Sequence, residues 1–145
     1  MQTKLNVLPD HLCKPDYTIG STDAPQSKGF RRWQACIKRF AHFPNVFIKL
    51  SGAFSEMSLD RVATTSSEEL SARLKAWTDS VFDSFPADRI MFGSDWPVCN
   101  VRGPAVEQSW SVWKDIVTSI LAERKLDDRQ KQCIWLNTAK EAYGL

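Results

Sequence analysis

The sequence predicts an α/β protein with a parallel sheet, and three observations support this fold class. Short runs rich in apolar and β-branched residues alternate with longer stretches in which apolar residues recur at helical spacing. This order of strand, loop and helix occurs three times, which is the pattern of βαβ units. Each predicted strand also ends in a cluster of polar residues. Because ligands of α/β proteins bind outside the carboxyl ends of the strands, we expect a site there.

The predicted strands are short and cover residues 5–8, 46–50 and 90–93. Their apolar and β-branched composition separates them from the helical stretches. The polar clusters at their ends are Asp10-His11 with Lys14, Lys49 with Ser51, and Ser94-Asp95.

Four helices are predicted, over residues 29–43, 66–85, 104–124 and 128–142, with a long loop over residues 12–28. Ser66 and Glu69 have the spacing of a capping box at the start of the second helix. Pro104 suits the first turn of the third helix, and Gly144 suits a stop after the fourth.

The composition is that of a soluble globular domain, because 43% of the 145 residues are hydrophobic and 25% are charged. A formal net charge of +2, with Lys and Arg dispersed, argues against a nucleic-acid or membrane-surface partner. We find no apolar run typical of a signal peptide or a membrane span. Without C-x-x-C spacing, we expect four reduced thiols in a cytoplasmic protein: Cys13, Cys36, Cys99 and Cys133.

Four segments of the chain together resemble a known family. Residues 10–15 read D-H-L-C-K-P, residues 46–52 read V-F-I-K-L-S-G, and residues 89–98 read R-I-M-F-G-S-D-W-P-V. Asn137, Ala139 and Tyr143 then form an N-x-A...Y pattern. In this order and spacing, the segments resemble the C-terminal part of the amidohydrolase-related family, and its lactone-hydrolysing branch in particular.

The resemblance implies a partial TIM (β/α)₈ barrel made of the last three βα units, strands six to eight, plus C-terminal helices. Residues 1–145 would then be the C-terminal portion of a single barrel domain. A complete barrel takes about 250 residues. The His-x-His pair of the family's first strand has no counterpart, because His11 and His42 are the only histidines. The implied activity is hydrolysis of a small sugar lactone by activated-water attack on the carbonyl.

Asp95 is the leading catalytic candidate. By resemblance, it would take a proton from water and return one to the departing alkoxide. The alternative is a helix-capping or turn aspartate, which is common after a strand. His11 would polarise or position the substrate, whereas a loop histidine is otherwise an ordinary hydrogen-bonded surface group.

A metal is expected only in a complete barrel. Catalytic zinc ordinarily has three protein ligands and a water molecule. His11 and Asp95 are two ligands at most, so we predict no tight metal site in these residues by themselves. A divalent metal such as zinc could bind where other units add ligands.

The remaining candidates would contact the substrate. Lys14 and Lys49 could hold a carboxylate or hydroxyl group, although a loop lysine such as Lys14 is normally only solvated. Ser51 and Ser94 could orient groups by hydrogen bonding, and neither lies in a G-x-S-x-G nucleophile motif. Trp96 is expected beside the pocket.

The sequence also allows a second hypothesis, in which the chain is not an enzyme but an association module. The chain could be a truncated, catalytically inactive barrel fragment. Three strands of a barrel leave strand edges and apolar faces uncovered. Such a fragment would self-associate into a homo-oligomer or pair with a complementing chain.

Overall fold

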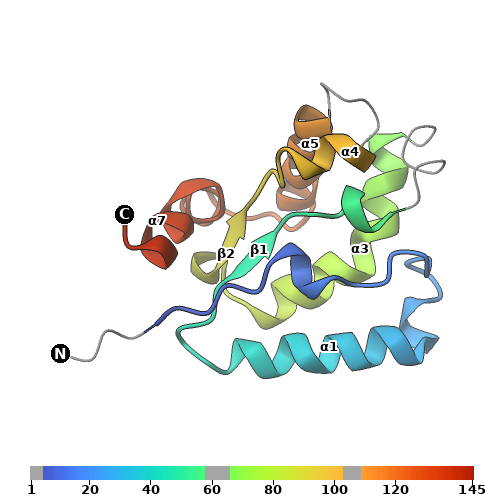
Figure 1. Cartoon of the computed structure of the whole chain (residues 1–145), viewed down its shortest axis with the longest axis horizontal. Helices are drawn as coiled ribbons and strands as arrows, with labels where there is room; N and C mark the ends of the chain where they lie inside the picture. The colour runs from blue at the N-terminus through green and yellow to red at the C-terminus, as the bar shows by residue number, and fades with distance from the viewer. Residues whose placement is uncertain (1–4, 58–65, 103–108) are drawn as a thin grey trace.

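A computed structural model describes residues 5–57, 66–102 and 109–145. At its centre, strand β1 (Ile48–Leu50) pairs in parallel with strand β2 (Ile90–Phe92) (Figure 1). Ile48 lies opposite Ile90, and Leu50 lies opposite Phe92. Val7 forms an isolated parallel bridge with Val46, so β1 lies between the N-terminal segment and β2. The predicted parallel α/β arrangement is confirmed for these segments.

The strand predicted over residues 5–8 is reduced to that single bridge at Val7. The Phe47 amide donates to the Val7 carbonyl (3.0 Å), and the Lys49 amide donates to the Pro9 carbonyl (3.2 Å). Pro9 has no N–H group to donate in return, so regular pairing stops there.

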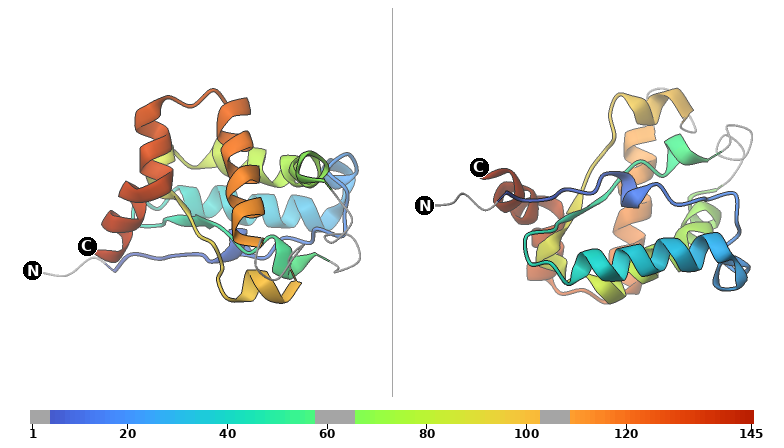
Figure 2. Two further views of the ribbon diagram at one scale, coloured as in Figure 1. Left: turned by 90° about the horizontal axis from the view of Figure 1, so that it is seen from above. Right: turned by 60° about the horizontal axis from the view of Figure 1, so that its bottom comes forward.

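Two long helices lie side by side along one side of the strands (Figures 1 and 2). Helix α1 (Lys28–Ala41) begins at Ser27, whose hydroxyl accepts hydrogen bonds from the next helical amides. Helix α3 (Ser67–Ser84) begins at Ser66, whose hydroxyl accepts from the Glu69 amide at 3.2 Å. The Ser66 half of the predicted capping box is therefore confirmed. The helix predicted to reach residue 43 ends at Ala41, because His42 takes the C-cap position.

The C-terminal region differs from the two predicted helices. It contains α4 (Val98–Arg102), α5 (Ser109–Glu123), α6 (Asp128–Gln132), a π-helical turn (Cys133–Asn137) and α7 (Thr138–Tyr143). The break between α6 and α7 is this wider turn. Pro104, predicted to start a helix, lies outside the described residues. Gly144 ends α7 with φ 70°, as predicted.

Short 3₁₀ turns connect the longer elements. They lie at His11–Cys13, Ala24–Gln26, Phe54–Glu56 and Ala87–Arg89. The turn at His11–Cys13 packs on β1, and α7 lies near the amino ends of the strands, as Figure 1 shows. The polar residues Ser51, Ser94 and Asp95 come after the carboxyl ends of the strands, on the side away from α7.

The strands bury different residues on their two faces. Ile48, Leu50 and Ile90 belong to the main core with α1, α3 and α5. Phe47 and Met91 point to the opposite face and pack against Ala142 of α7. Because strand side chains alternate between faces, Lys49 and Ser51 share the face of Phe47.

None of the described helices is long and apolar enough to cross a membrane. The four cysteines are free thiols, as the sequence predicts.

Candidate active site

The structure brings His11 and Asp95 together from two separate loops. Nε2 of His11 lies 3.4 Å from Oδ1 of Asp95. His11 follows the N-terminal extended segment, and Asp95 follows β2. The side chain of Asp95 is only 8% exposed, whereas that of His11 is 27% exposed. Two polar clusters at the carboxyl ends of parallel segments therefore meet, as the sequence pattern suggests.

Ser51 contacts the other nitrogen of the same ring. Its hydroxyl oxygen lies 3.0 Å from Nδ1 of His11. Ser51 is 1% exposed and follows β1 directly. The imidazole consequently links Ser51 on one side to Asp95 on the other.

The backbone at both catalytic candidates is left-handed. His11, Leu12, Cys13 and Lys14 have φ between 49° and 59°, and Asp95 has φ 59°. Each such non-glycine residue costs about 1–2 kcal/mol relative to the right-handed conformation. The Trp33 indole donates to the Leu12 carbonyl at 2.8 Å, which helps hold the His11 turn against α1. Backbone strain of this kind concentrates at functional sites.

Two glycines make room for these side chains. A Cβ atom at Gly52, whose φ is 72°, would lie 2.4 Å from Nδ1 of His11. A Cβ atom at Gly93 would lie 3.0 Å from the Cβ atom of Ser51. The Trp113 indole donates to the Gly93 carbonyl at 3.0 Å and so holds the end of β2. Neither glycine was singled out as a site residue from the sequence, although both lie inside the family segments.

The carboxylate of Asp95 has one oxygen without a partner in the described part of the chain. Oδ2 is buried and accepts no hydrogen bond from the residues that the structure describes. A buried acceptor left unpaired normally costs about 1–3 kcal/mol, so such groups are rare and informative. Nearby, burial and the charge of Asp95 raise the pKa of the Cys99 thiol. Asp95 therefore offers a free proton acceptor in a confined position.

The two candidate lysines have carboxylate partners in the chain. Nζ of Lys49 lies 2.7 Å from Oδ1 of Asp10, and Nζ of Lys14 lies 3.2 Å from Oε1 of Glu56. Burial lowers the pKa of Lys49, but hydrogen bonds to Asp10 and Tyr143 outweigh it, and the pKa is raised overall. Lys49 is partly buried, while Lys14 is mostly exposed. Asp10 and Glu56 were not singled out individually from the sequence.

Ser94 and Trp96 lie in the loop around Asp95. The Ser94 hydroxyl accepts from the Trp96 amide at 3.2 Å, which folds this loop. The Trp96 side chain is exposed, and a cis peptide bond joins it to Pro97.

The donor set does not complete a zinc site. His11 and Asp95 supply two donors that contact each other. Within residues 5–57, 66–102 and 109–145, no three His, Cys, Asp or Glu side chains are grouped to hold an ion. Three protein ligands are usual for catalytic zinc, so these residues by themselves do not fit it.

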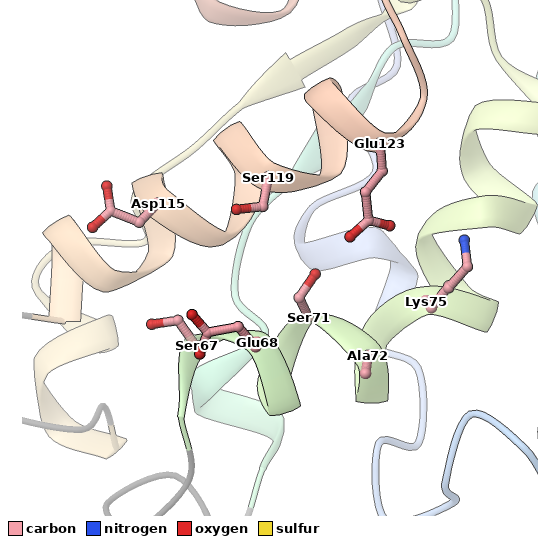
Figure 3. Close-up of a pocket in the computed structure, with 8 residues that line it drawn as sticks. All are labelled: Ser67, Glu68, Ser71, Ala72, Lys75, Asp115, Ser119 and Glu123. Carbon is pink, nitrogen blue, oxygen red and sulfur yellow. The ribbon is translucent and has the colours of Figure 1, made fainter.

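A separate polar cavity of about 410 Å³ lies between α3 and α5, in the helical layer (Figure 3). Ser71 of α3 and Ser119 and Glu123 of α5 line it. None of the residues that line it comes from the cluster around His11. It is therefore distinct from the site at the strand ends.

Comparison with known proteins identifies the class. The sequence profile described as amidohydrolase matches residues 3–145, so the chain belongs to the amidohydrolase family. It is 30% identical over 139 residues to an L-fucono-1,5-lactonase of Burkholderia multivorans, covering 94% of this chain and 42% of that protein. It is 25% identical over 142 residues to an L-rhamnono-gamma-lactonase of Scheffersomyces stipitis, covering 97% and 41%. The chain thus spans less than half of these relatives.

Solved structures show the same relationship. A Burkholderia multivorans amidohydrolase with bound zinc superposes with a TM-score of 0.74 at 28% identity, covering 97% of this chain and 44% of that one. The same protein with bound HEPES gives a TM-score of 0.73 at 27% identity, covering 97% and 45%. The chain therefore has the fold of part of an amidohydrolase, in agreement with a partial barrel. The numbering of its units as six to eight stays a prediction.

Proposed function

We propose that His11 and Asp95 belong to the active site of a hydrolase that opens a small sugar lactone. The observation that carries this proposal is the buried Oδ2 of Asp95, which has no hydrogen-bond partner among the residues that the structure describes, while Oδ1 lies 3.4 Å from Nε2 of His11. Lactone opening needs a proton acceptor for the attacking water, and this oxygen is free to serve. The lactonase relatives support the substrate class.

In the proposed reaction, Oδ2 of Asp95 accepts a proton as the water oxygen attacks the lactone carbonyl. The tetrahedral intermediate collapses by breaking the ring C–O bond. Asp95 then returns its proton to the departing alkoxide, so water and lactone give one hydroxy acid. His11 positions the carboxylate through Oδ1. No step is assigned to a metal, although His11 and Asp95 could be two ligands of a zinc ion where further barrel units contribute the rest.

The rim residues would provide substrate contacts. Trp96 presents an exposed indole next to Asp95 in sequence, suited to the apolar face of a sugar ring. Ser94 would orient a hydroxyl group. Lys14 and Lys49 would contact substrate oxygens by exchanging their present partners, Glu56 and Asp10, for the ligand.

We further propose that the three βα units correspond to strands six to eight of the barrel.

The N-terminal segment pairs with β1 on one side, and its Leu5 and Val7 side chains are exposed. An uncovered strand edge with apolar side chains favours association. The second candidate function is therefore an inactive barrel portion that self-associates or binds a complementing chain.

One experiment separates these functions. The purified chain is passed through size-exclusion chromatography with light scattering, and each peak is assayed with a panel of small sugar lactones. Hydrolysis that is lost in Asp95→Asn but kept in Asp128→Asn, a change at an exposed helix end, supports the lactonase. Oligomers without hydrolysis favour the association function. A monodisperse, inactive monomer counts against both.

A further inference from the structure

We propose that Ser51 is a positioning residue that sets the tautomer of His11. Its hydroxyl donates a hydrogen bond to Nδ1 and thereby keeps the imidazole proton on Nε2, facing Asp95. The role of this arrangement in catalysis rests on the proposed function, but the tautomer itself does not.

The chemistry of the two partners gives the favoured position of the imidazole proton. Oδ1 of Asp95 lies in close polar contact with Nε2, at 3.4 Å, and a carboxylate oxygen can only accept, so this contact favours the proton on Nε2. A neutral imidazole has one N–H group, which leaves Nδ1 as an acceptor. The hydroxyl of Ser51, 3.0 Å from Nδ1, is then the donor.

The packing around Ser51 keeps this hydroxyl in place. Ser51 is 1% exposed, and its side chain lies against Gly93, where even a Cβ atom would come within 3.0 Å. The Gly93 amide donates to the Leu50 carbonyl at 3.2 Å, which ties β2 to the end of β1 beside Ser51. The ring of His11 lies directly on Gly52. The packing therefore holds the buried Ser51 hydroxyl beside the ring.

The tautomer decides which carboxylate oxygen is available. With the proton on Nε2, His11 occupies Oδ1, and Oδ2 stays open. With the proton on Nδ1, a nitrogen lone pair would face the carboxylate, and the two would repel each other. Ser51 therefore acts on Asp95 through the ring of His11.

The order Ser51–His11–Asp95 also resembles a nucleophilic triad, but burial argues against that role. A nucleophilic serine must reach the substrate carbonyl. Ser51 is almost fully enclosed, whereas the open oxygen belongs to Asp95. Positioning is the function that the geometry favours.

The test is ¹⁵N NMR of the imidazole nitrogens in the full chain, with the pH raised until the ring signals no longer change, so that the neutral ring is observed. His42 is the only other histidine, so His42→Gln leaves a single ring to observe. We expect His11 to be mainly protonated on Nε2. In Ser51→Ala, the ratio of the Nε2–H to the Nδ1–H form should fall about tenfold, which is the effect of one hydrogen bond.

Two further variants sharpen the test. Ser80→Ala is the matched control, because Ser80 is also a buried serine but its hydroxyl donates to the Ala76 carbonyl within α3, so the tautomer ratio should not change. Ser51→Cys is somewhat larger but keeps a weak donor at the same position, so it should restore part of the ratio. An Nδ1–H form in the parent chain, or an unchanged ratio in a folded Ser51→Ala, overturns the proposal.

The outcome is independent of the lactonase assay. The expected ratios in a chain without hydrolysis would contradict the proposed function and leave the role of Ser51 intact. Where hydrolysis is found, Ser51→Ala should lower kcat with little change in KM, because Ser51 is 1% exposed and would act on Asp95 through the ring of His11.

Discussion

Gly52 lies directly against the imidazole ring of His11, since a Cβ atom there would be 2.4 Å from Nδ1. Its φ of 72° is also a conformation that residues with a side chain seldom adopt. Gly52 thus allows both the left-handed turn after β1 and the close packing of the candidate catalytic histidine against the backbone.

Gly52→Ala should therefore destabilise the protein and displace His11. We expect the free energy of unfolding to fall by about 2–5 kcal/mol, combining the left-handed backbone and the overlap with the ring. Urea denaturation measures this value. Gly20→Ala is the matched control, because a Cβ atom there meets nothing nearer than 3.8 Å. Equal effects of the two substitutions would contradict the close packing at Gly52.

Tyr17→Phe should stabilise the protein. The Tyr17 hydroxyl is buried and has no hydrogen-bond partner among the described residues. Burial, and then the charge of Glu56, raise the pKa of Tyr17 above its usual range. Removing an unpaired buried hydroxyl should raise the free energy of unfolding by about 1 kcal/mol.

Trp33→Phe should destabilise the protein, in contrast to Tyr17→Phe. The Trp33 indole donates to the Leu12 carbonyl at 2.8 Å, and its loss should lower the free energy of unfolding by about 1–3 kcal/mol. Thermal and chemical denaturation of both variants give the comparison. A loss of stability in Tyr17→Phe would mean that its hydroxyl has a partner after all.

The capping box of α6 gives a fourth prediction. Oδ1 of Asp127 accepts from the Gln130 amide at 2.8 Å, and Oε1 of Gln130 accepts from the Asp127 amide at 3.0 Å. Asp127→Ala should cost about 1 kcal/mol in the free energy of unfolding. The neighbouring Asp128→Ala, at an exposed side chain, should cost clearly less. The idea fails if urea denaturation gives the reverse order.

Cys13 should react slowly with alkylating reagents. Burial, together with the nearby Cys36, raises the pKa of its thiol from 9.0 to about 11. At a pH of about 8, its thiolate fraction should be about 100-fold below that of a thiol with pKa 9.0. Iodoacetamide labelling followed by peptide mass spectrometry measures the rate, with the exposed Cys36 as the internal comparison.

The raised pKa of Cys13 fixes how its alkylation rate and its contribution to stability change with pH. Alkylation of Cys13 should accelerate about tenfold per pH unit until the pH reaches about 11. Because the pKa in the folded state lies above the ordinary 9.0, the buried thiol contributes stability below pH 9.0 that is lost as the pH rises through about 11. Labelling of Cys13 as fast as Cys36 at the lower pH would contradict its burial.

Local signals predict the helices well where the interaction stays within one turn. Ser66 caps α3 and Gly144 ends α7, because each acts on amides or carbonyls a few residues away. The π-helical turn at Cys133–Asn137 has no comparable local signal, and the predicted helix there is wrong in this detail. The strand predicted over residues 5–8 is only a single bridge at Val7, because Pro9 has no N–H group to continue the pairing. The apolar pattern of residues 5–8 does not include this effect of Pro9.

The sequence by itself determined the α/β class, the family resemblance and the prominence of Asp95 and His11. These features depend on periodicity, composition and contiguous motifs, which are properties of neighbouring residues. Only the tertiary structure decided that Ser51 and Asp95 contact opposite nitrogens of His11, and that Asp10 pairs with Lys49. Such contacts join segments that are distant in the chain, and packing selects them through distances and directions that a linear pattern does not contain.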